Sequence, residues 1–551
     1  MSGEQIRQEH TTLGIEFGST RIKACLVDSA GLTLATGSSS WESELSDGIW
    51  TYSLDAVHEG LAAAYADLAR QVREVHGIEL RAVGAIGISA MMHGYLALDS
   101  AGELLTPFRT WRNTNTTQAA EHLSEVFGQN IPLRWSVAHH YQAVLDAEPH
   151  IPRVRTLTTL AGYIHHRLTG THVLGIGDAS GMFSIDPATG SYDGELLDRY
   201  TQLTRPLLGD AADASDGAGG GGRGDAAGGT ALEQLLPPVA SAGTQAGFLT
   251  PEGAQLLDPS GTLEPGIIFC PPEGDAGTGM VATNAVRERT GNVSVGTSIF
   301  AMLVLEDSPR SPRPEIDIVA TPEGKLVAMV HCNNGASELG TWAGVFGEFL
   351  ANLGLAADPD EVFQAMLGGA LETDAAENGL LAYNLLAAEP VIGVDRGMSM
   401  ILRAPESPLT LAGFARAQLL GVFAALSVGM RVLAEEGVSV DRFFAHGGLL
   451  RTGGVAQRAL AAALQTPVSV TREATEGGAW GMAVLAGYAL AVSTSHTSGR
   501  SLPDWLDAEI FAGSLAETVE PSAEEIEGYA KFLDRWLTGL PVQRAAGEAL
   551  T

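Results

Sequence analysis

An aspartate near the middle of the chain has the surroundings expected of a general base. Asp275 lies in the segment Pro272–Gly279, where small residues on both sides leave room for a ligand. A carboxylate in such a place can take the proton of a hydroxyl group that attacks a phosphorus atom. The same segment is also typical of a plain Asp-Gly turn. Asp275 is therefore a catalytic candidate only in combination with groups that bind phosphate.

Two short turns supply such groups. Gly18, Ser19 and Thr20 follow an apolar segment in the first half, and Gly296, Thr297 and Ser298 follow another in the second half. Glycine lets the backbone approach a phosphate closely, while N–H and hydroxyl groups donate hydrogen bonds to its oxygens. One such turn alone would indicate an ordinary hairpin. Two of them, one in each half, predict that a polyphosphate is held from both sides.

Two charged residues flank the first turn. Glu16 stands in an apolar segment, where an acid is costly unless it is paired with a positive group or binds a metal. Mg²⁺ uses few carboxylates and keeps several waters, so one acid beside the phosphates suits it; the alternative is a salt bridge to an arginine. Lys23 is one of three lysines in the chain and is either a phosphate contact or a surface residue.

A third group of residues suits a polyhydroxyl ligand. Met92 and His93 follow a predicted buried strand, and Trp111 and Asn113 come after a short loop. A sugar presents apolar C–H faces to rings and hydroxyls to amides and imidazoles. The alternative is that His93 and Trp111 are ordinary core residues.

The elements that would position these residues alternate between strand and helix. The first half predicts a hairpin, a helix capped by Ser53 and ended by Gly77, and a buried strand. The second half, from about Thr278, opens on a similar hairpin and continues with long helices and short strands. The predicted strands are 13–17, 22–27, 83–88, 292–295, 299–305, 442–445 and 468–470, and one long helix is predicted over 411–436. This order indicates layered α/β domains.

One segment falls outside this pattern. Residues 210–229 are rich in glycine and predict a mobile surface insertion. The letters at 217–222 fit GxGxxG, but no strand precedes them and no helical pattern follows, so a phosphate loop is rejected.

Composition narrows the function classes. The formal net charge of −33 over 551 residues argues against nucleic acid and anionic membranes as partners. The three cysteines show no metal-ligand or disulfide spacing, and residues 1–11 lack the apolar core of a signal peptide. The longest apolar stretch, Trp480–Val492, is too short to span a bilayer. We therefore expect a cytoplasmic protein of two large domains.

In their order, the motifs resemble those of the FGGY carbohydrate kinases of the actin, hexokinase and Hsp70 superfamily, with xylulokinases most similar. The resemblance is carried by six short segments: Gly14–Lys23, Ala90–Gly94, Gly274–Gly277, Val295–Ser298, Gly335–Ser337 and Gly447–Gly448. It implies two actin-like, ribonuclease H-like domains with a nucleotide cleft between them. The expected boundaries are 1–277 for the sugar-binding domain and 278–551 for the ATP-binding domain. It also implies that Gly335, Gly447, Gly448 and Thr452 bind ATP.

The resemblance implies a mechanism as well. Asp275 would deprotonate the acceptor hydroxyl, and Mg²⁺ near Glu16 and Asp275 would bridge the ATP phosphates. The turns at Gly18 and Gly296 would hold those phosphates. Asp178, in Gly177–Gly181, is a further sugar contact or else a residue that caps a loop. A small sugar or polyol is the expected substrate, and a homodimer is one option, since dimers are common in the family.

Several departures from the family pattern lie in the sugar domain. Glu16 replaces the usual aspartate, and Trp111–Asn115 lacks both charges of the family's Trp-x-Asp-x-Arg segment. The Lys-x-x-Trp segment expected near residue 143 is absent, and Ala161-Gly162 replaces a Lys-Asp pair. These changes favour a kinase with an altered sugar preference. A pentulose such as xylulose is the leading substrate. The alternatives are a ribulokinase, a polyol kinase, or a non-catalytic actin-like ATPase or sugar sensor.

Overall fold

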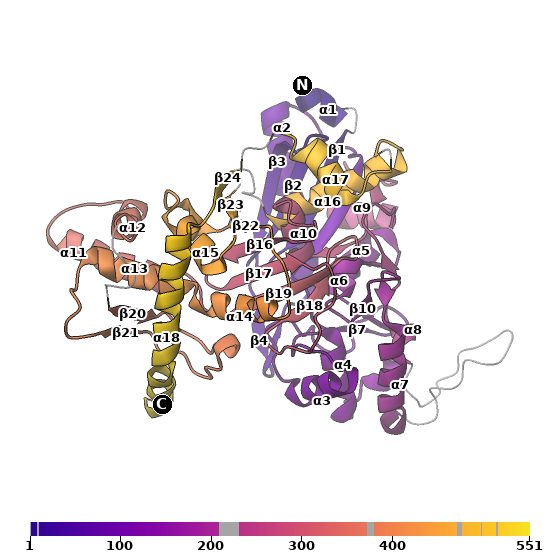
Figure 1. The fold of residues 1–551 in the computed structure, drawn as a ribbon. Helices are drawn as coiled ribbons and strands as arrows, with labels where there is room; N and C mark the ends of the chain where they lie inside the picture. Colours follow the sequence, from indigo (N-terminus) through magenta and orange to yellow (C-terminus); the bar gives the residue numbers. More distant parts are fainter. Residues whose placement is uncertain are drawn as a thin grey trace. The chain divides into compact units, whose positions relative to one another are not determined.

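The structure, a computed structural model, describes residues 2–7, 10–208, 231–371, 379–470, 477–497, 499–513 and 516–550 (Figure 1). The insertion predicted at 210–229 lies outside these residues. The chain forms two compact units. Unit 1 comprises Met1–Asn284, Ile318–Val327 and Ala474–Ala512, and unit 2 comprises Ala285–Asp317, Ala328–Glu473 and Gly513–Thr551. Each unit therefore combines separate stretches of sequence, and the predicted boundary at residue 277 stays a prediction.

Unit 1 is built on a seven-stranded mixed sheet whose order is β13-β14-β6-β1-β2-β3, with β15 also pairing with β6. The strands are β1 (Thr11–Phe17), β2 (Arg21–Asp28), β3 (Thr33–Ser40), β6 (Ala85–Ala90), β13 (Gly247–Phe248), β14 (Ile268–Phe269) and β15 (Glu273–Gly274). β1 pairs antiparallel with β2 and parallel with β6. The predicted first hairpin is confirmed, and the predicted strand at 83–88 lies two residues further along the chain.

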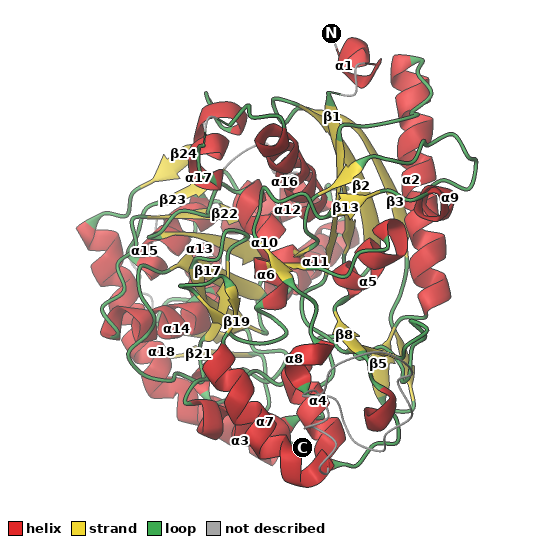
Figure 2. Ribbon diagram, turned by 90° about the vertical axis from the view of Figure 1, so that its right-hand side faces the viewer, coloured by secondary structure: helices red, strands yellow, loops and turns green. Residues whose placement is uncertain are grey.

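Helices cover both faces of this sheet (Figure 2). On one face α2 (Leu54–His76) begins at Ser53, whose side chain accepts the Ala56 N–H, and ends at Gly77 in the left-handed conformation, as predicted. On the other, α16 (Gly478–Ser493) lies so close to β1 that a methyl group on Gly14 would come within 2.9 Å of the Met482 carbonyl carbon. Because β1 is covered on both sides, nearly every one of its residues is buried.

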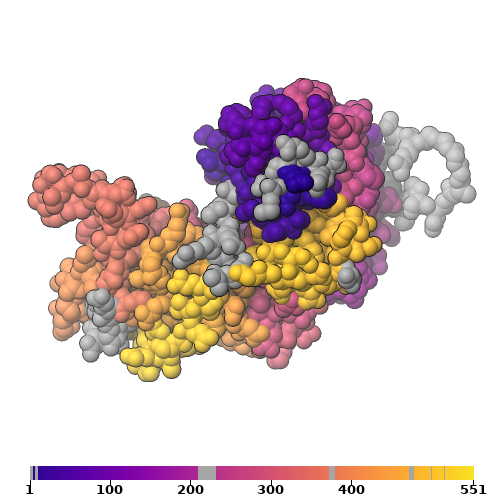
Figure 3. Space-filling view, turned by 90° about the horizontal axis from the view of Figure 1, so that it is seen from above, coloured from indigo at the N-terminus to yellow at the C-terminus, as the bar shows by residue number. Residues whose placement is uncertain are grey.

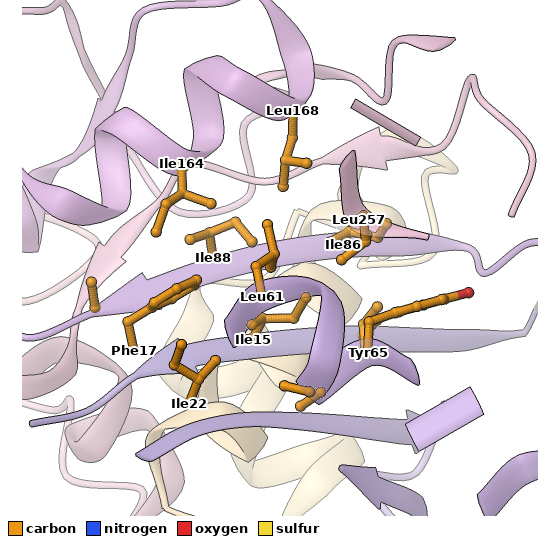
Figure 4. Packing of buried hydrophobic residues seen from close by; sticks show 14 of the residues in the cluster. Ile15, Phe17, Ile22, Leu61, Tyr65, Ile86, Ile88, Ile164, Leu168 and Leu257 are labelled. Atoms are coloured by element: carbon orange, nitrogen blue, oxygen red, sulfur yellow. The ribbon is translucent and has the colours of Figure 1, made fainter. Parts of the chain in front are cut away.

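The core between the sheet and α2 consists of aliphatic and aromatic side chains (Figure 4). It includes Ile15, Phe17, Ile22, Leu61, Tyr65, Ile86, Ile88, Ile164, Leu168 and Leu257. Burial of apolar surface stabilises this layer by about 25 cal/mol for each Å² removed from water. It also fixes the ends of β1 and β6. Polar residues at those strand ends are thereby held in place.

The remaining elements of unit 1 surround this layer. The helices are α1 (Ser2–Arg7), α3 (Thr117–Phe127), α4 (Ser136–Leu145), α5 (Leu160–Thr169), α6 (Ile176–Ala179), α7 (Gly194–Leu208), α8 (Leu232–Leu235), α9 (Pro251–Leu257), α10 (Asp275–Ala282) and α17 (Leu502–Trp505). Short strands form pairs β4 (Glu44–Ser46) with β5 (Ile49–Thr51), β7 (Leu96–Leu98) with β8 (Thr156–Thr158), β9 (Leu174–Gly175) with β12 (Val239–Ala240), and β10 (Ile185–Asp186) with β11 (Ser191–Tyr192).

A second seven-stranded sheet has the order β18-β19-β17-β16-β22-β23-β24. Its strands β16, β17, β22, β23 and β24 lie in unit 2, whereas β18 lies almost wholly in the Ile318–Val327 stretch of unit 1. The strands are β16 (Thr290–Val295), β17 (Ile299–Val304), β18 (Asp317–Ala320), β19 (Leu326–Cys332), β22 (Arg442–His446), β23 (Val468–Val470) and β24 (Glu517–Val519). β16 and β17 form the predicted second hairpin. The helices are α11 (Ser337–Asn352), α12 (Pro359–Leu367), α13 (Leu411–Val422), α14 (Ala424–Glu435), α15 (Val455–Leu464) and α18 (Ala523–Ala549), and β20 (Leu380–Tyr383) pairs with β21 (Met400–Arg403). In Figure 3, α11 and α12 stand out as a projection of unit 2.

The single helix predicted over 411–436 is wrong, because the structure has two helices, α13 and α14, bent by 44° at Phe423. Two backbone carbonyls before the bend accept hydrogen bonds from outside the helix. Asn384 Nδ2 donates to Gln418 O at 2.8 Å, and Tyr529 Oη donates to Leu420 O at 3.2 Å. Side chains that insert into the hydrogen-bond ladder of a helix bend it.

Within the described parts of the chain, no helix taken singly has both the length and the apolar character needed to cross a membrane. The bent pair α13–α14 meets those two criteria only when its members are taken together.

Candidate active site

The carboxyl group of Asp275 lies at the junction between a strand and a helix of unit 1. β15 pairs with β6 so that Gly274 is level with Ala90, and Asp275 is the first residue of α10. Asp275 Oδ1 accepts the Met92 N–H at 3.0 Å. Burial raises the pKa of Asp275, and hydrogen bonds from backbone N–H groups oppose that rise. The group is thus more basic than an exposed aspartate, which suits the removal of a proton from a hydroxyl.

Glu16 reaches the same region from β1. Its register partners are Ser89 on β6 and Lys23 on β2. Burial, and then the charge of Asp275, raise the pKa of Glu16 to about 7, while Lys23 and the Ala479 N–H act in the opposite direction. No arginine forms an ion pair with Glu16 within the described ranges, so the alternative of an arginine salt bridge does not apply.

The two acids together fit a magnesium ion. The negative charge of each is unfavourable to the other, and a divalent cation would remove that repulsion. Among the described residues, no three His, Cys, Asp or Glu side chains gather in a way that could hold a metal without other ligands. Mg²⁺ bound by one or two carboxylates together with phosphates and waters needs no such group.

Two aromatic side chains hold the first predicted phosphate turn. Trp41 Nε1 donates to Gly18 O at 2.7 Å, and Tyr52 Oη donates to Ser19 O at 2.6 Å. The two rings stack with centroids 4.1 Å apart. In a planar trans peptide the N–H points away from the C=O, so the N–H groups of Ser19 and Thr20 point away from these aromatic side chains. Adjacent N–H groups of this kind suit an anion.

Beside this turn is a pocket whose lining is partly cationic. It is lined by Thr20, Arg21, Lys23, Ser40, Trp41 and Glu42. Lys23 is one of the residues that line it, and its contact with phosphate stays a prediction.

Asp178 lies on α6 and is buried, with 1% of its surface exposed. Thr159 Oγ1 donates to Asp178 Oδ2 at 2.5 Å, and within the described residues Asp178 Oδ1 has no hydrogen-bond partner. Burial raises the pKa of Asp178 to about 7. A methyl group on Gly274 would lie 3.5 Å from Oδ1, so this free oxygen is adjacent to the Asp275 junction. A buried acceptor without a partner is suited to a ligand hydroxyl.

The other predicted sugar contacts have different surroundings. Met92 and His93 are both 5% exposed, and a methyl group on Gly274 would lie 2.9 Å from Met92 Cγ, so Met92 packs beside the Asp275 junction. His93 has a positive φ of 71°, and its Nδ1 lies 3.3 Å from Gly181 O. Trp111 is 37% exposed. Asn113 is buried and uses both ends of its amide on the backbone of Trp50: the Trp50 N–H donates to Oδ1, and Nδ2 donates to Trp50 O.

The predicted ATP-binding residues of the second half lie in unit 2. A methyl group on Gly335 would come within 2.8 Å of Thr297 O, and the Ala336 N–H donates to Gly296 O at 2.8 Å. Gly447, with a φ of 127°, would place a methyl group 2.8 Å from the Val295 carbonyl carbon. Gly335 thus packs closely against the turn Gly296–Ser298, and Gly447 packs against Val295, the residue just before it. Gly448 begins a 3₁₀ turn, and Thr452 Oγ1 donates to Leu449 O at 2.8 Å.

Comparison with known proteins decides the family. Residues 11–220 match the model of the N-terminal domain of the FGGY family of carbohydrate kinases, and residues 291–490 match the model of its C-terminal domain. The chain belongs to this family. The predicted resemblance is confirmed, and the family to which the chain belongs is one of carbohydrate kinases, which transfer a phosphoryl group to an alcohol group of a sugar.

Individual relatives are distant. A xylulose kinase of Lactococcus lactis is 23% identical over 223 residues, which cover 38% of this chain and 42% of that protein. The chain spans about half the length of the curated relatives it matches. A xyloylose kinase structure from Brucella ovis is 20% identical, with a TM-score of 0.74 over 97% of this chain and 100% of the other. A gluconate kinase structure from Lactobacillus acidophilus is 18% identical, with a TM-score of 0.75 over 98% and 99%. The predicted two-domain α/β fold of this family is confirmed.

Sequence reasoning missed Trp41, Tyr52 and Glu273. Glu273 had a signal, since it is an acid at the end of the apolar segment that leads to Asp275. Trp41 and Tyr52 had none, because their partners lie 23 and 33 residues away in sequence.

Proposed function

We propose that this FGGY family member transfers the γ-phosphoryl group of ATP to a hydroxyl of a small sugar, and that the sugar is a pentulose of the xylulose type. The observation that carries the proposal is the Asp275 carboxyl group, which is made more basic by burial and lies beside the free Oδ1 of Asp178. Family membership and the xylulose kinases among the relatives support the choice of reaction and sugar.

In the proposed reaction, Asp178 Oδ1 accepts a hydrogen bond from the sugar and helps to orient it. Asp275 takes the proton of the attacking hydroxyl as the oxygen–phosphorus bond forms, and ADP leaves with the β–γ bridging oxygen. The N–H groups of Ser19 and Thr20, with Lys23, bind phosphate oxygens of ATP. From unit 2, the turn Gly296–Ser298 binds phosphate, and Gly335, Gly447, Gly448 and Thr452 serve the nucleotide.

Glu16 and Asp275 are the residues that would hold Mg²⁺, which would supply positive charge to the ATP phosphates. We also propose a cytoplasmic location and a homodimer as the assembly to test.

The deciding experiment is an ADP-release assay with ATP, Mg²⁺ and a panel of ketoses, polyols and aldonic acids. We expect xylulose to stimulate ADP release most strongly, with ribulose, gluconate and glycerol weaker. Asp275→Asn should lower kcat by a factor of at least about 10² to 10⁴ while ATP binding, measured by calorimetry, changes little. ATP hydrolysis that no member of the panel stimulates would instead favour a non-catalytic ATPase or sensor. Full turnover in Asp275→Asn would remove Asp275 from its proposed role.

A further inference from the structure

Glu273 occupies a buried position between two segments that are far apart in sequence. It lies on β15, two residues before Asp275, and 2% of its surface is exposed. Its Oε2 accepts the Asp178 N–H at 3.0 Å, and among the described residues its Oε1 has no hydrogen-bond partner. Asp178 and Glu273 are 95 residues apart in sequence.

The N–H group that donates to Glu273 is one of those left without a partner at the start of a helix. α6 begins at Ile176, so Gly177 and Asp178 are its second and third residues, and Gly175, in the N-cap position, offers no side chain. The first N–H groups of a helix have no partner within it and are usually satisfied by the N-cap side chain. Here Glu273, from β15, accepts the hydrogen bond that an N-cap side chain would otherwise accept.

The backbone around Glu273 is shaped to its carboxyl group. A methyl group on Gly177 would overlap Glu273 Oε2, and its other close neighbour would be Ala320 O, at 3.3 Å. A methyl group on Gly175 would lie 2.5 Å from Glu273 Cδ. The two glycines thus leave the space that the carboxyl group fills, and the turn that carries Asp178 is fitted to Glu273 by both a hydrogen bond and shape.

We propose that Glu273 is a positioning residue for the acceptor sugar. By capping α6 from β15, it sets the location of the Asp178 carboxyl group relative to Asp275, which is two residues further along the chain at the start of α10. The proposal rests on the proposed function, because it takes Asp178 as the sugar contact and Asp275 as the base.

The test is a double-mutant cycle on the full-length protein, using the sugar on which the wild type is most active. Glu273→Ala removes the cap, and Gly177→Ala pushes a methyl group against it. Each single variant should raise the KM for the sugar about fivefold to tenfold, corresponding to the loss of one helix cap, with the KM for ATP within twofold of wild type. In the double variant the methyl group added at position 177 enters the space left by the carboxyl group. Its sugar KM should therefore be no higher than that of Glu273→Ala alone.

Two further variants separate positioning from general stability. Glu273→Gln keeps an oxygen that can accept the Asp178 N–H, and its sugar KM should return to within about twofold of wild type. Asp258→Ala removes another buried acid of unit 1, one that accepts the N–H groups of Thr262 and Leu263. It should lower the melting temperature and leave the sugar KM unchanged. If Glu273→Ala does not fold, Gly177→Ala and Glu273→Gln still decide the matter.

The outcomes distinguish this proposal from the one on which it rests. A wild type that phosphorylates no sugar refutes the proposed function and this proposal with it. An active wild type, combined with an unchanged sugar KM in folded Glu273→Ala or Gly177→Ala, refutes the positioning role alone. Equal increases in the KM values for sugar and ATP, or single-variant effects that simply add in the double variant, also refute it.

Discussion

Removal of one hydroxyl group, in Tyr52→Phe, should weaken ATP binding and leave the sugar unaffected. Tyr52 Oη donates to Ser19 O at 2.6 Å, and the ring stacks on Trp41, whose Nε1 donates to Gly18 O. Phenylalanine keeps the stack and removes only the hydrogen bond. The peptide between Ser19 and Thr20 then loses the contact that fixes its orientation, so the Thr20 N–H is no longer held toward the side where we propose that phosphate binds.

The size of the effect follows from one partly buried hydrogen bond. Such a bond contributes a net 0.5–1.5 kcal/mol, about a twofold to tenfold change in an equilibrium constant. Ser19 is exposed, so water can solvate its carbonyl in the variant, and the lower part of this range is expected. We therefore predict a rise of about twofold to fivefold in the KM for ATP and in the Kd for ADP, with the KM for the sugar unchanged.

The measurements are steady-state kinetics and calorimetric ADP titration, and Tyr65→Phe is the matched control. Tyr65 is a buried residue of α2 whose hydroxyl donates to Leu80 O at 3.4 Å, within the core and away from the turn. It should change the melting temperature without changing the KM for ATP. If Tyr52→Phe is folded and binds ADP like the wild type, or if it weakens sugar and ADP equally, the proposed orientation of the turn is wrong.

Three further predictions concern other parts of the chain. In Gly478→Ala the added methyl group would overlap Glu16 Oε1 and lie 2.9 Å from Thr278 Oγ1. This variant should lower the free energy of unfolding by about 1–3 kcal/mol and raise the Mg²⁺ concentration needed for half-maximal activity. An unchanged Mg²⁺ dependence would argue against Glu16 as a ligand. His139 is fully buried, which lowers its pKa to about 3. The unfolded state, with an imidazole pKa near 6.5, therefore binds more protons between these values, and the free energy of unfolding falls as the pH drops below about 6.5, by up to about 1.4 kcal/mol per pH unit. The denaturation midpoint of His139→Gln should depend less on pH than that of the wild type between pH 7 and 5, and parallel profiles would contradict this. Trp111→Ala should raise the KM for the sugar and leave that for ATP unchanged, whereas equal losses would indicate a folding defect.

The sequence predicted those parts of the fold that depend on local chemistry. Both hairpins, the Ser53 cap and the Gly77 stop are set by residues within a few positions of one another, and each is present in the structure. The bend at Phe423 was missed for the opposite reason. Its cause is two hydrogen bonds from Asn384 and Tyr529, which are 34 and 109 residues away from their acceptors. Both donors lie outside residues 411–436, so the helical pattern of that segment cannot indicate the bend.

In the candidate site, too, some features follow from the local sequence and others depend on tertiary contacts. Asp275 is a candidate because small residues surround an acid at a strand end, and the turn Gly18–Thr20 is a candidate because of its own glycine and hydroxyl residues. Asn113 shows the limit of that approach. Its residue type suits a sugar, yet its amide accepts from and donates to the backbone of Trp50, 63 residues away, and also donates to Thr110 O. Residue type indicates which hydrogen bonds a side chain can make, but tertiary contacts decide which ones remain for a ligand.

The buried acids of unit 1 have raised pKa values, which indicate where a ligand would bind. Burial raises the pKa values of Glu16 and Asp178 to about 7 and that of Glu273 to about 8. Each therefore prefers the neutral form more strongly than an exposed acid does, so charging them disfavours the folded protein as the pH rises from about 4 to 8. Such a concentration of unfavourable charge is uncommon in a structural core and typical of a binding site. A cation near Glu16 and hydroxyl donors near Asp178 would relieve it. Ligand binding should then stabilise this unit more at pH 8 than at pH 6, because the acids that the ligands satisfy are ionised only at the higher pH.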